Sequence, residues 1–274
     1  MLVAKDFRFG LSMRFIKSRA ALQEKVMRAE DLGFDVLCVP DHIGAAAPFP
    51  TLTAVAMVTT TMRLSMYVLN AAFYKPALLS RDLEALDLLS DGRLEIGLGT
   101  GYVREEFDAA ELPYPSAGAR VDYLEHMTTY LKDHHPTAPI LIAGNGDRVL
   151  TLAAQYADII GLTGAHVRGA DDPLTERIDF VRNAAGDRFD ALELNLVITA
   201  VPAEGDSMPN LSMTRRYSPG LSDEEILAMH SVLTGSPREM ADTLCQYRDI
   251  YGVTFFTVQD NHFDNFAKVI AELR

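Results

Sequence analysis

Short apolar runs alternate along the chain with segments in which apolar residues recur every three or four positions. The run DVLCVP at residues 35–40 is typical of a strand buried on both faces of a parallel sheet. Between residues 18 and 32, Leu22, Val26 and Ala29 follow a helical period. The pattern predicts strands at 7–12, 35–40, 63–70, 93–99, 139–144, 158–162, 194–201 and 253–258. It predicts helices at 18–32, 51–61, 76–89, 118–131, 148–156, 173–185, 237–251 and 261–273.

Strands that alternate with helices pair in parallel through right-handed crossovers. Eight such units predict an α/β fold, a closed (β/α)8 TIM barrel, with an open doubly wound sheet as the alternative. The 274 residues match the roughly 250 residues that are typical of one barrel, so we expect a single domain over residues 1–274. The longest irregular stretch, 202–222, follows the seventh predicted strand, and we expect it to lie over the barrel mouth as a lid.

The composition limits which partners and which cell compartment we expect. A formal net charge of −13 argues against nucleic acid, because an acidic surface repels phosphate backbones. Any anionic cofactor must then be held by local positive dipoles. The two cysteines, Cys38 and Cys245, form no CxxC motif and fit a reducing compartment. The sequence shows no signal-peptide core and no uncharged stretch of the roughly 18–20 residues that span a membrane. We therefore expect a cytoplasmic protein with no membrane partner.

Candidate chemistry is sought where the predicted strands end, since TIM barrels gather their functional residues there. Asp41 and His42 follow the second predicted strand. Histidine suits a proton donor or acceptor near neutral pH, and we expect Asp41 to orient its ring. The alternative is that Asp41 caps a helix beside a histidine with a structural role.

Small residues follow the third and fourth predicted strands. Asn70 and Ala71 would let a flat ring approach the backbone, unless they form a plain loop. The run GLGTGY at 97–102 has the spacing GxGxG and follows the fourth strand, so it is not the dinucleotide fingerprint of a Rossmann fold. We expect its glycines, Gly99 and Gly101 among them, to make room for a ligand at a packed strand end.

Two glycine turns follow the fifth and sixth predicted strands. The turn GNGDR at 144–148 opens a helix, and the first N–H groups of a helix carry a partial positive charge that binds phosphate. The turn GLTG at 161–164 adds the hydroxyl of Thr163. Together the turns predict a two-sided phosphate clamp, with ordinary loop turns as the alternative.

Neither a metal site nor a serine nucleophile is expected, because the sequence contains no HExxH and no GxSxG motif. We expect His134 and His135 in a solvated turn at the N-terminal end of the fifth strand, away from the mouth. The histidines are His42, His126, His134, His135, His166, His230 and His262.

Five stretches, taken in order, carry the most specific signal, and through them nearly the whole chain resembles the luciferase-like monooxygenase superfamily in its coenzyme F420-dependent branch. They are AEDLGFDVLCVPDH at 29–42, VLNAAFYKPALLSRDLEALDLLSDGRLEIGLGTGY at 68–102, FDAAELPYPSAGARVDYLE at 107–125, PILIAGNGDRVLTLAAQYADIIGL at 139–162 and VLTGSPREMADTLCQYRDIYGVTFFTV at 232–258.

The resemblance implies a TIM barrel that binds coenzyme F420 or, as the alternative, FMN at its mouth. It implies a bulge with a non-proline cis peptide bond at residues 69–71, and a phosphate site at the two glycine turns. The catalytic candidates are Asp41, His42, Tyr74 and Tyr102. The expected cofactor contacts are Ser12, Asp41, His42, Leu69, Asn70, Ala71, Gly99, Thr100, Gly101, Gly144, Asn145, Gly146, Asp147, Gly161, Leu162 and Thr163.

The chain departs from the family pattern in three places. Only residues 132–138 link the fourth helix to the fifth strand, where relatives usually carry a long insertion. We expect this short link either to open the mouth to a bulky substrate or to weaken cofactor binding. Tyr74 stands where arginine is frequent. Tyr102 stands where sugar-phosphate dehydrogenases of the family have glutamate, which argues against a sugar-phosphate substrate.

We therefore expect an F420H2-dependent reductase of an activated C=C or C=N bond, with a natural-product-type small molecule or a modified peptide as substrate. His42, Tyr74 or Tyr102 would supply the proton, and the cofactor the hydride. The alternatives are an FMN-dependent monooxygenase and a non-catalytic relative that has lost cofactor binding. Analogy with the family adds a homodimer as an expectation.

Overall fold

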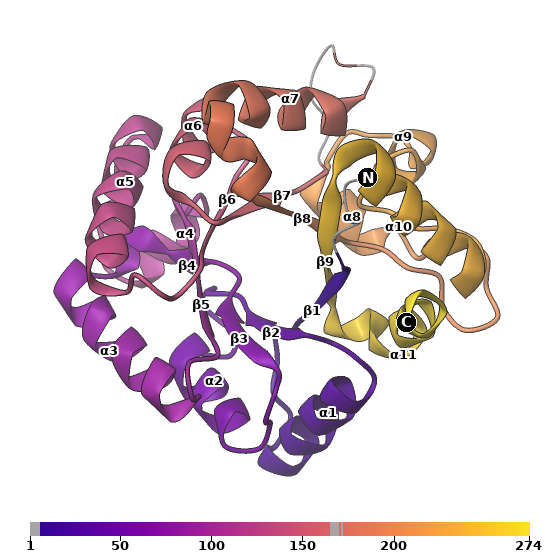
Figure 1. Cartoon of the computed structure of the whole chain (residues 1–274), viewed down its shortest axis with the longest axis horizontal. Coiled ribbons are helices and arrows are strands. Elements are labelled where there is room, and N and C mark those ends of the chain that lie inside the picture. Colours follow the sequence, from indigo (N-terminus) through magenta and orange to yellow (C-terminus); the bar gives the residue numbers. More distant parts are fainter. Residues whose placement is uncertain (1–5, 165–169, 171) are drawn as a thin grey trace.

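Each strand of the computed structural model, which describes residues 6–164, 170 and 172–274, pairs in parallel with its neighbours around a closed ring (Figure 1). The sheet order is β3-β2-β1-β9-β8-β7-β6-β5-β4, and a β3–β5 pairing closes it. The strands are β1 (Arg8–Ser12), β2 (Val36–Val39), β3 (Arg63–Met66), β4 (Leu69–Asn70), β5 (Leu94–Gly99), β6 (Ile140–Ala143), β7 (Ile159–Leu162), β8 (Glu193–Ile198) and β9 (Val253–Gln259).

The predicted strand 63–70 forms one side of the ring in two parts. β3 and β4 both pair with β5, and the peptide bond Tyr67–Val68 between them is cis. We call residues 67–68 the bulge. The cis bond was expected at 69–71, so its predicted position was wrong, although it does lie in this strand. With β3 and β4 counted as one interrupted strand, the eight-stranded TIM barrel is confirmed.

Helices surround the barrel and cover the outer faces of its strands (Figure 1). The α-helices are α1 (Arg19–Asp31), α2 (Pro48–Ala56), α3 (Pro76–Leu89), α4 (Arg104–Ala109), α5 (Ala117–His134), α6 (Asp147–Tyr156), α7 (Pro173–Ala185), α8 (Ser212–Tyr217), α9 (Asp223–Leu227), α10 (Pro237–Tyr251) and α11 (Phe263–Leu273). The 3-10 turns are η1 (Ala71–Phe73), η2 (Gly186–Ala191) and η3 (Asp260–His262).

The predicted bounds of α3, α7 and α10 are confirmed. Each helix begins with proline, whose missing N–H is not needed in a first turn and whose fixed φ suits a helix. A capping box formed by Ser236 and Glu239 starts α10, where the side chain of Ser236 accepts from the N–H of Glu239. Helix starts of this kind can be located from local sequence alone.

Helix α2 differs from its predicted range of 51–61. It starts at Pro48, again a proline at a first turn, and it ends at Ala56. Beyond the helix, the carboxylate of Glu30 in α1 accepts from the N–H groups of Thr60, Thr61 and Met62. These three N–H groups therefore bond to a side chain of α1 and not to a preceding helical turn.

The link between α5 and β6 is shorter than predicted, because α5 continues to His134 and leaves only residues 135–139. A helix-to-strand link lies at the N-terminal end of a barrel, whereas the mouth lies at the C-terminal end. The short link therefore cannot open the mouth, and the expectation that it does was wrong. His134 and His135 lie at this N-terminal end as expected, but not in a solvated turn: His134 is the exposed last residue of α5, and His135 is half-buried and bonded to Ser80.

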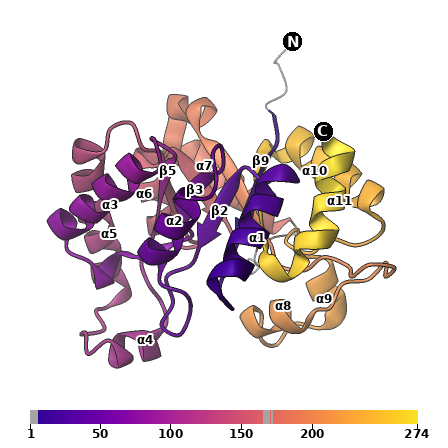
Figure 2. The same ribbon diagram turned by 90° about the horizontal axis from the view of Figure 1, so that it is seen from below.

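Three short helices lie at the end of the barrel where the strands finish, at the bottom of Figure 2, with the C-terminus on the opposite side. Helix α4 follows β5, and α8 and α9 follow β8. The sequence pattern predicted none of them, and α8 lies within the stretch 202–222 that was read as irregular. That stretch does follow β8 to the mouth end, as expected of a lid.

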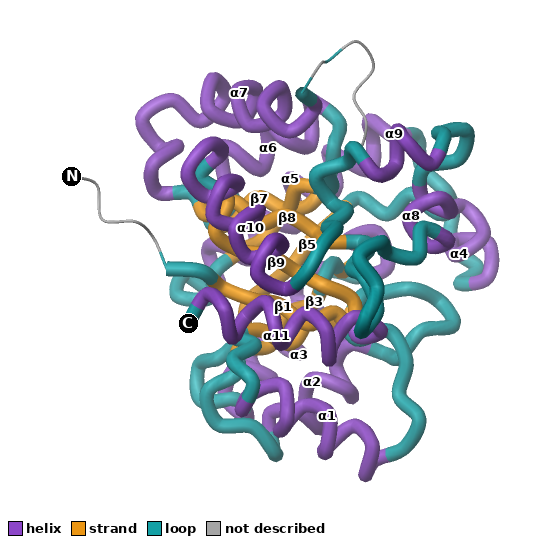
Figure 3. The backbone as a smooth tube through the Cα atoms, turned by 90° about the vertical axis from the view of Figure 1, so that its right-hand side faces the viewer, coloured by secondary structure: helices purple, strands orange, loops and turns teal. Residues whose placement is uncertain are grey.

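The barrel interior is closed at the end opposite the mouth by ionic side chains. Arg8 forms ion pairs with Glu95 and Glu193, and Glu95 is 1% exposed. Nearer the mouth, the Tyr67 hydroxyl donates to Oδ1 of Asn195 at 2.5 Å. Figure 3 shows the strands inside a layer of helices. The residues of the main apolar core come from these strands and helices. Among the described residues, no helix combines the length and the apolar character needed to cross a bilayer.

Candidate functional site

Half-buried side chains at the strand ends form the floor of the mouth. They are Ser12 of β1, Val68 of the bulge, Ala143 of β6, Val197 of β8 and Gln259 of β9. Ser12 and Gln259 are register partners, and Val68 and Ala143 pack against the cluster inside the barrel. None of these side chains is charged, so the floor offers a small, neutral surface to a flat ring.

His42 lies at this mouth and is bonded to a residue that the sequence did not suggest. Its Nδ1 is 2.8 Å from Oε1 of Glu106, and the two side chains are 28% and 15% exposed. An ionised carboxylate only accepts hydrogen bonds, so Nδ1 carries the proton and Nε2 is left to serve the site. Glu106 therefore holds the imidazole in one orientation.

Helix α4 brings Glu106 to His42. Next to Glu106, Phe107 is 1% exposed and makes edge contacts with Phe73 and Tyr114, at ring-centroid distances of 5.2 and 5.0 Å. This aromatic anchor fixes a helix of only six residues against the loop after β4. The position of Glu106 thus depends on packing between two loops at the mouth.

Asp41 has a different partner from the one we expected. Its Oδ2 accepts from the backbone N–H of Asn70 at 3.1 Å, and its carboxylate also bonds to the hydroxyl of Tyr74. Burial raises the pKa of Asp41, while the two hydrogen bonds act in the opposite direction. Asp41 therefore connects the β2 end to the β4 end, and the prediction that it orients His42 was wrong.

The two candidate tyrosines differ in their surroundings. Burial, and next the Asp41 carboxylate, raise the pKa of Tyr74, which makes its hydroxyl a weaker acid. The backbone oxygen of Tyr74 accepts from the hydroxyl of Tyr123 at 2.7 Å. Tyr102 is 65% exposed at the rim. Of the predicted proton donors, His42 has the most favourable arrangement.

The glycines of β5 make room for protein and not directly for a ligand, which corrects our expectation. A Cβ on Gly97 would lie 1.8 Å from the carbonyl oxygen of Met66, and one on Gly99 would lie 2.7 Å from Val68. Gly101 has a φ of +68°, and a Cβ there would lie 2.2 Å from Oδ1 of Asn70. The GxGxG spacing therefore lets β5 accept the bulge.

The two glycine turns lie together, as expected. The N–H of Gly144 donates to the carbonyl of Gly161 at 3.4 Å. Gly146 is the N-cap of α6, and no side chain caps this helix, so its first N–H groups point outward without a protein acceptor from the cap. A Cβ on Gly146 would meet nothing within 4 Å. This open, positively polarised turn is suited to an anion.

Arg177 of α7 supports the same turn. Its Nη1 donates to the carbonyl of Asn145 at 3.1 Å and to Oδ1 of Asp147 at 2.7 Å, and its side chain is only 12% exposed. Asn145, Arg177, Leu162 and Gly164 line a small hollow between α6, β7 and α7. The turn is therefore braced by a cation from the next helix.

The structure divides the expected cofactor contacts by exposure. The partly or fully exposed residues among them are Ser12, Asp41, His42, Thr100, Gly101, Gly144, Asn145, Gly146, Asp147 and Thr163. The buried ones are Leu69, Asn70, Ala71, Gly99, Gly161 and Leu162. In the bulge strand, Val68 presents the side chain to the mouth in place of Leu69 to Ala71.

Sequence reasoning missed Glu106, Val68, Arg177 and Gln259. Glu106 was within reach, because a glutamate after a strand end is a common acid/base or positioning group. Gln259 extends the predicted last strand by one residue. Nothing local in the sequence distinguishes Arg177 or Val68 from neighbouring residues on their elements.

The mouth combines a hydrogen-bonded imidazole with a helix start that has no side-chain cap. Among the described residues, no group of three or more His, Cys, Asp or Glu side chains is arranged to hold a metal ion. His166 lies outside the described residues.

Comparison with known proteins agrees with this geometry. Residues 12–209 match the family model of the luciferase-like monooxygenases. The chain is 26% identical over 192 residues to the 5,10-methylenetetrahydromethanopterin reductase of Archaeoglobus fulgidus, covering 63% of this chain and 57% of the reductase. It is also 26% identical over 259 residues to the F420-dependent glucose-6-phosphate dehydrogenase of Kribbella flavida, covering 81% of this chain and 76% of that enzyme.

Among solved structures, the coenzyme F420 dependent tetrahydromethanopterin reductase of Methanopyrus kandleri superposes with a TM-score of 0.74 at 16% identity, covering 98% of this chain and 97% of that one. At such low identity, the superposition shows only that the two chains share a fold. The family model spans well over half of the residues, from the end of β1 to the loop beyond β8. The chain therefore belongs to the luciferase-like monooxygenase family.

Proposed function

We propose that the protein is an F420H2-dependent oxidoreductase that reduces an activated C=C or C=N bond. The observation that carries this proposal is that His42, paired with Glu106, lies at the same end of the barrel as the uncapped start of α6. One group can deliver a proton while the other holds an anionic cofactor tail. Relatives named for F420 support the choice of cofactor.

The residues at the α6 turn fit the cofactor's phosphate. Gly144, Asn145 and Gly146 would offer backbone N–H groups. Arg177, whose charge is paired with Glu176 and Asp147, would hold this turn in place through the Asn145 carbonyl. The neutral floor of the mouth, with Val68 at the bulge, fits one face of a ring. When bound, reduced F420 supplies the hydride.

The protein's share of the reaction is positioning and proton delivery. Glu106 holds Nδ1–H of His42, which leaves Nε2 free to pass a proton from solvent to the substrate atom next to the one that takes the hydride. Asp41 fixes the spacing between the β2 and β4 ends through Asn70. After each turnover Nε2 takes the next proton from solvent.

The substrate that we propose is an uncharged molecule of the natural-product or modified-peptide type. Its support is a set of large apolar side chains exposed on the loops at the mouth. They are Phe15, Ile16, Ile43, Tyr102 and Met208, which are 61%, 38%, 52%, 65% and 52% exposed.

The test is the anaerobic oxidation of F420H2 in the presence of α,β-unsaturated carbonyl compounds or imines. The return of F420 absorbance measures this oxidation. The wild-type protein is expected to turn over at least one of these classes. His42→Ala is expected to retain F420 and to lose roughly 10²–10⁴ of the rate. Oxygenated product from reduced FMN and O2, with no F420H2 oxidation, would instead identify a monooxygenase.

A further inference from the structure

Arg120, near the start of α5, is a buried arginine that has no ion-pair partner within the described part of the chain. The residue is 9% exposed, and its buried Nε–H finds no acceptor among the described residues. Its Nη1 donates to the carbonyl of Pro115 at 2.6 Å. A buried charge is costly unless neighbouring groups compensate for it. The guanidinium therefore depends on contacts other than a carboxylate.

The ring of Tyr114 provides such a contact. The central guanidinium carbon of Arg120 lies 4.4 Å from the centroid of this ring. The electrons of an aromatic face attract a planar guanidinium, and the attraction grows when water is excluded. At its other end the ring is held by its hydroxyl, which donates to the carbonyl of Tyr102 at 3.2 Å. Arg120 thus places Tyr114 between the start of α5 and the loop after β5.

Tyr114 in turn holds α4, which Figure 2 shows at the mouth end, below the longer helices α3 and α5. Phe107 is the buried residue of this six-residue helix, and its ring meets the ring of Tyr114 edge-on at 5.0 Å. The N-cap residue, Val103, makes no side-chain bond to the helix start. A short helix without such a cap owes its place to tertiary packing. The position of Glu106, next to Phe107, therefore follows from that of Tyr114.

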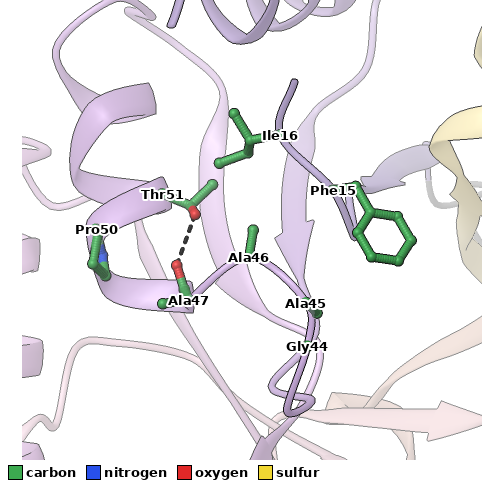
Figure 4. Close-up of a pocket in the computed structure, with 8 residues that line it drawn as sticks. All are labelled: Phe15, Ile16, Gly44, Ala45, Ala46, Ala47, Pro50 and Thr51. Atoms are coloured by element: carbon green, nitrogen blue, oxygen red, sulfur yellow. Dashed lines mark hydrogen bonds between the residues drawn. The ribbon is translucent and has the colours of Figure 1, made fainter. Parts of the chain in front are cut away.

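His42, the partner of this glutamate, is supported in a different way. The N–H of Ala45 donates to the His42 carbonyl at 3.0 Å, and the N–H of Ala46 donates to a carbonyl of the loop after β1 at 2.9 Å. The same turn leads into α2, where the hydroxyl of Thr51 donates to the carbonyl of Ala47 at 2.7 Å, the dashed line in Figure 4. Backbone bonds thus hold the histidine half of the pair, whereas side-chain packing holds the carboxylate half.

We propose that Arg120 is a positioning residue that fixes Glu106 against His42. It acts through two aromatic rings, those of Tyr114 and Phe107. The contacts run from α5, a helix of 18 residues, to α4, a helix of six, so the long helix sets the place of the short one. The link to turnover rests on the proposed function, whereas the link to the orientation of the imidazole does not.

The test replaces Arg120 in the full chain in two ways. Arg120→Lys keeps the charge and loses the planar group, whereas Arg120→Met keeps an unbranched side chain and loses the charge. The matched control is Arg104→Met. Arg104 of α4 also contacts the ring of Tyr114, at 5.3 Å, but its side chain is 67% exposed and pairs with Asp108. An exposed cation adds little to such a contact.

The main readout is nitrogen-15 NMR of the His42 ring, recorded without cofactor at a pH where the imidazole is neutral. We expect the wild type and Arg104→Met to show a single Nδ1–H tautomer, and both Arg120 variants to show a mixture. In F420H2 oxidation we expect both Arg120 variants to lose about tenfold in kcat with KM within about twofold, because a misplaced positioning group slows the reacting step more than it weakens binding.

A single Nδ1–H tautomer in folded Arg120→Lys and Arg120→Met would overturn the proposal, even with a lower melting temperature, because a merely structural role reduces stability and leaves the pair intact. The same mixture in Arg104→Met would also overturn it. If Arg120→Met does not fold, Arg120→Lys and Tyr114→Leu decide, and both are expected to show the mixture. The expected tautomers together with a wild type that does not oxidise F420H2 would overturn only the proposed function.

Discussion

Nδ1 of His42 and Oε1 of Glu106 lie 2.8 Å apart, although the two residues come from loops after different strands. The pair gives the imidazole one tautomer and one orientation. In this account Glu106 is a positioning residue, and His42 is the group that meets the substrate.

Glu106→Gln is expected to reduce turnover by less than the roughly 10²–10⁴ lost in His42→Ala, because a misoriented imidazole still transfers protons. Nitrogen-15 NMR of the His42 ring is expected to change from a single Nδ1–H tautomer to a mixture. The matched control is Glu105→Gln, since Glu105 is a neighbouring exposed residue of α4. The double variant His42→Ala/Glu106→Gln is expected to turn over at the same rate as His42→Ala alone. A further loss of rate as large as that of Glu106→Gln by itself would contradict the pairing.

Gly97→Ala is expected to destabilise the protein by about 3 kcal/mol or more, because its Cβ would lie 1.8 Å from the Met66 carbonyl oxygen. The control is Gly146→Ala, at a position with φ of −76° and open space for a Cβ, where the loss is expected to stay below about 1 kcal/mol. Urea unfolding measures both. Equal losses would mean that the glycines of β5 do not accommodate the bulge.

The fold was predictable from sequence because its signals are local. Buried parallel strands read as apolar runs, and proline at a first turn located α3, α7 and α10 to the residue. The short α4 was missed because six residues are too few to show a helical period. Its place depends on Phe107 packing on Phe73 and Tyr114.

The candidate site was predictable in its location but not in its pairings. The rule that barrels work at their strand ends brought His42 and the Gly144–Gly146 turn to one mouth. Which carboxylate meets His42 depends on tertiary packing: the adjacent Asp41 turns to Asn70, and Glu106, 64 residues away, takes its place. Sequence proximity was a poor guide to this contact.

Arg177→Gln is expected to weaken F420 binding about tenfold, because the turn loses its bond to the Asn145 carbonyl and the carboxylates of Asp147 and Glu176 lose the cation that pairs with them beside the phosphate site. The unfolding free energy is expected to fall by only about 1 kcal/mol. Arg182→Gln, on the same helix with a 49% exposed side chain, is the control. Equal F420 affinity in both variants would remove Arg177 from the cofactor site.

Acid is expected to destabilise the fold through one buried histidine, His262, and one half-buried histidine, His230. Burial lowers the pKa values of His230 and His262. The unfolded chain therefore binds protons first as pH falls through about 6.5, and the free energy of unfolding decreases below that pH, by at most about 1.4 kcal/mol per pH unit for each group. Urea unfolding between pH 7.5 and 5.5 is expected to show a shallower slope for His262→Gln. The same slope in both proteins would contradict this.

The most direct test of the central claim, that one mouth holds a deazaflavin by its anionic tail, is a fluorescence titration of the wild type and Gly146→Val with F420 and with FMN. Valine would fill the open space at the start of α6. We predict that the wild type binds F420 tightly and FMN weakly. Gly146→Val is expected to lose at least tenfold in F420 affinity while its melting temperature falls by no more than about 4 °C. Preference for FMN, binding of neither cofactor, or full F420 affinity in Gly146→Val would contradict the account.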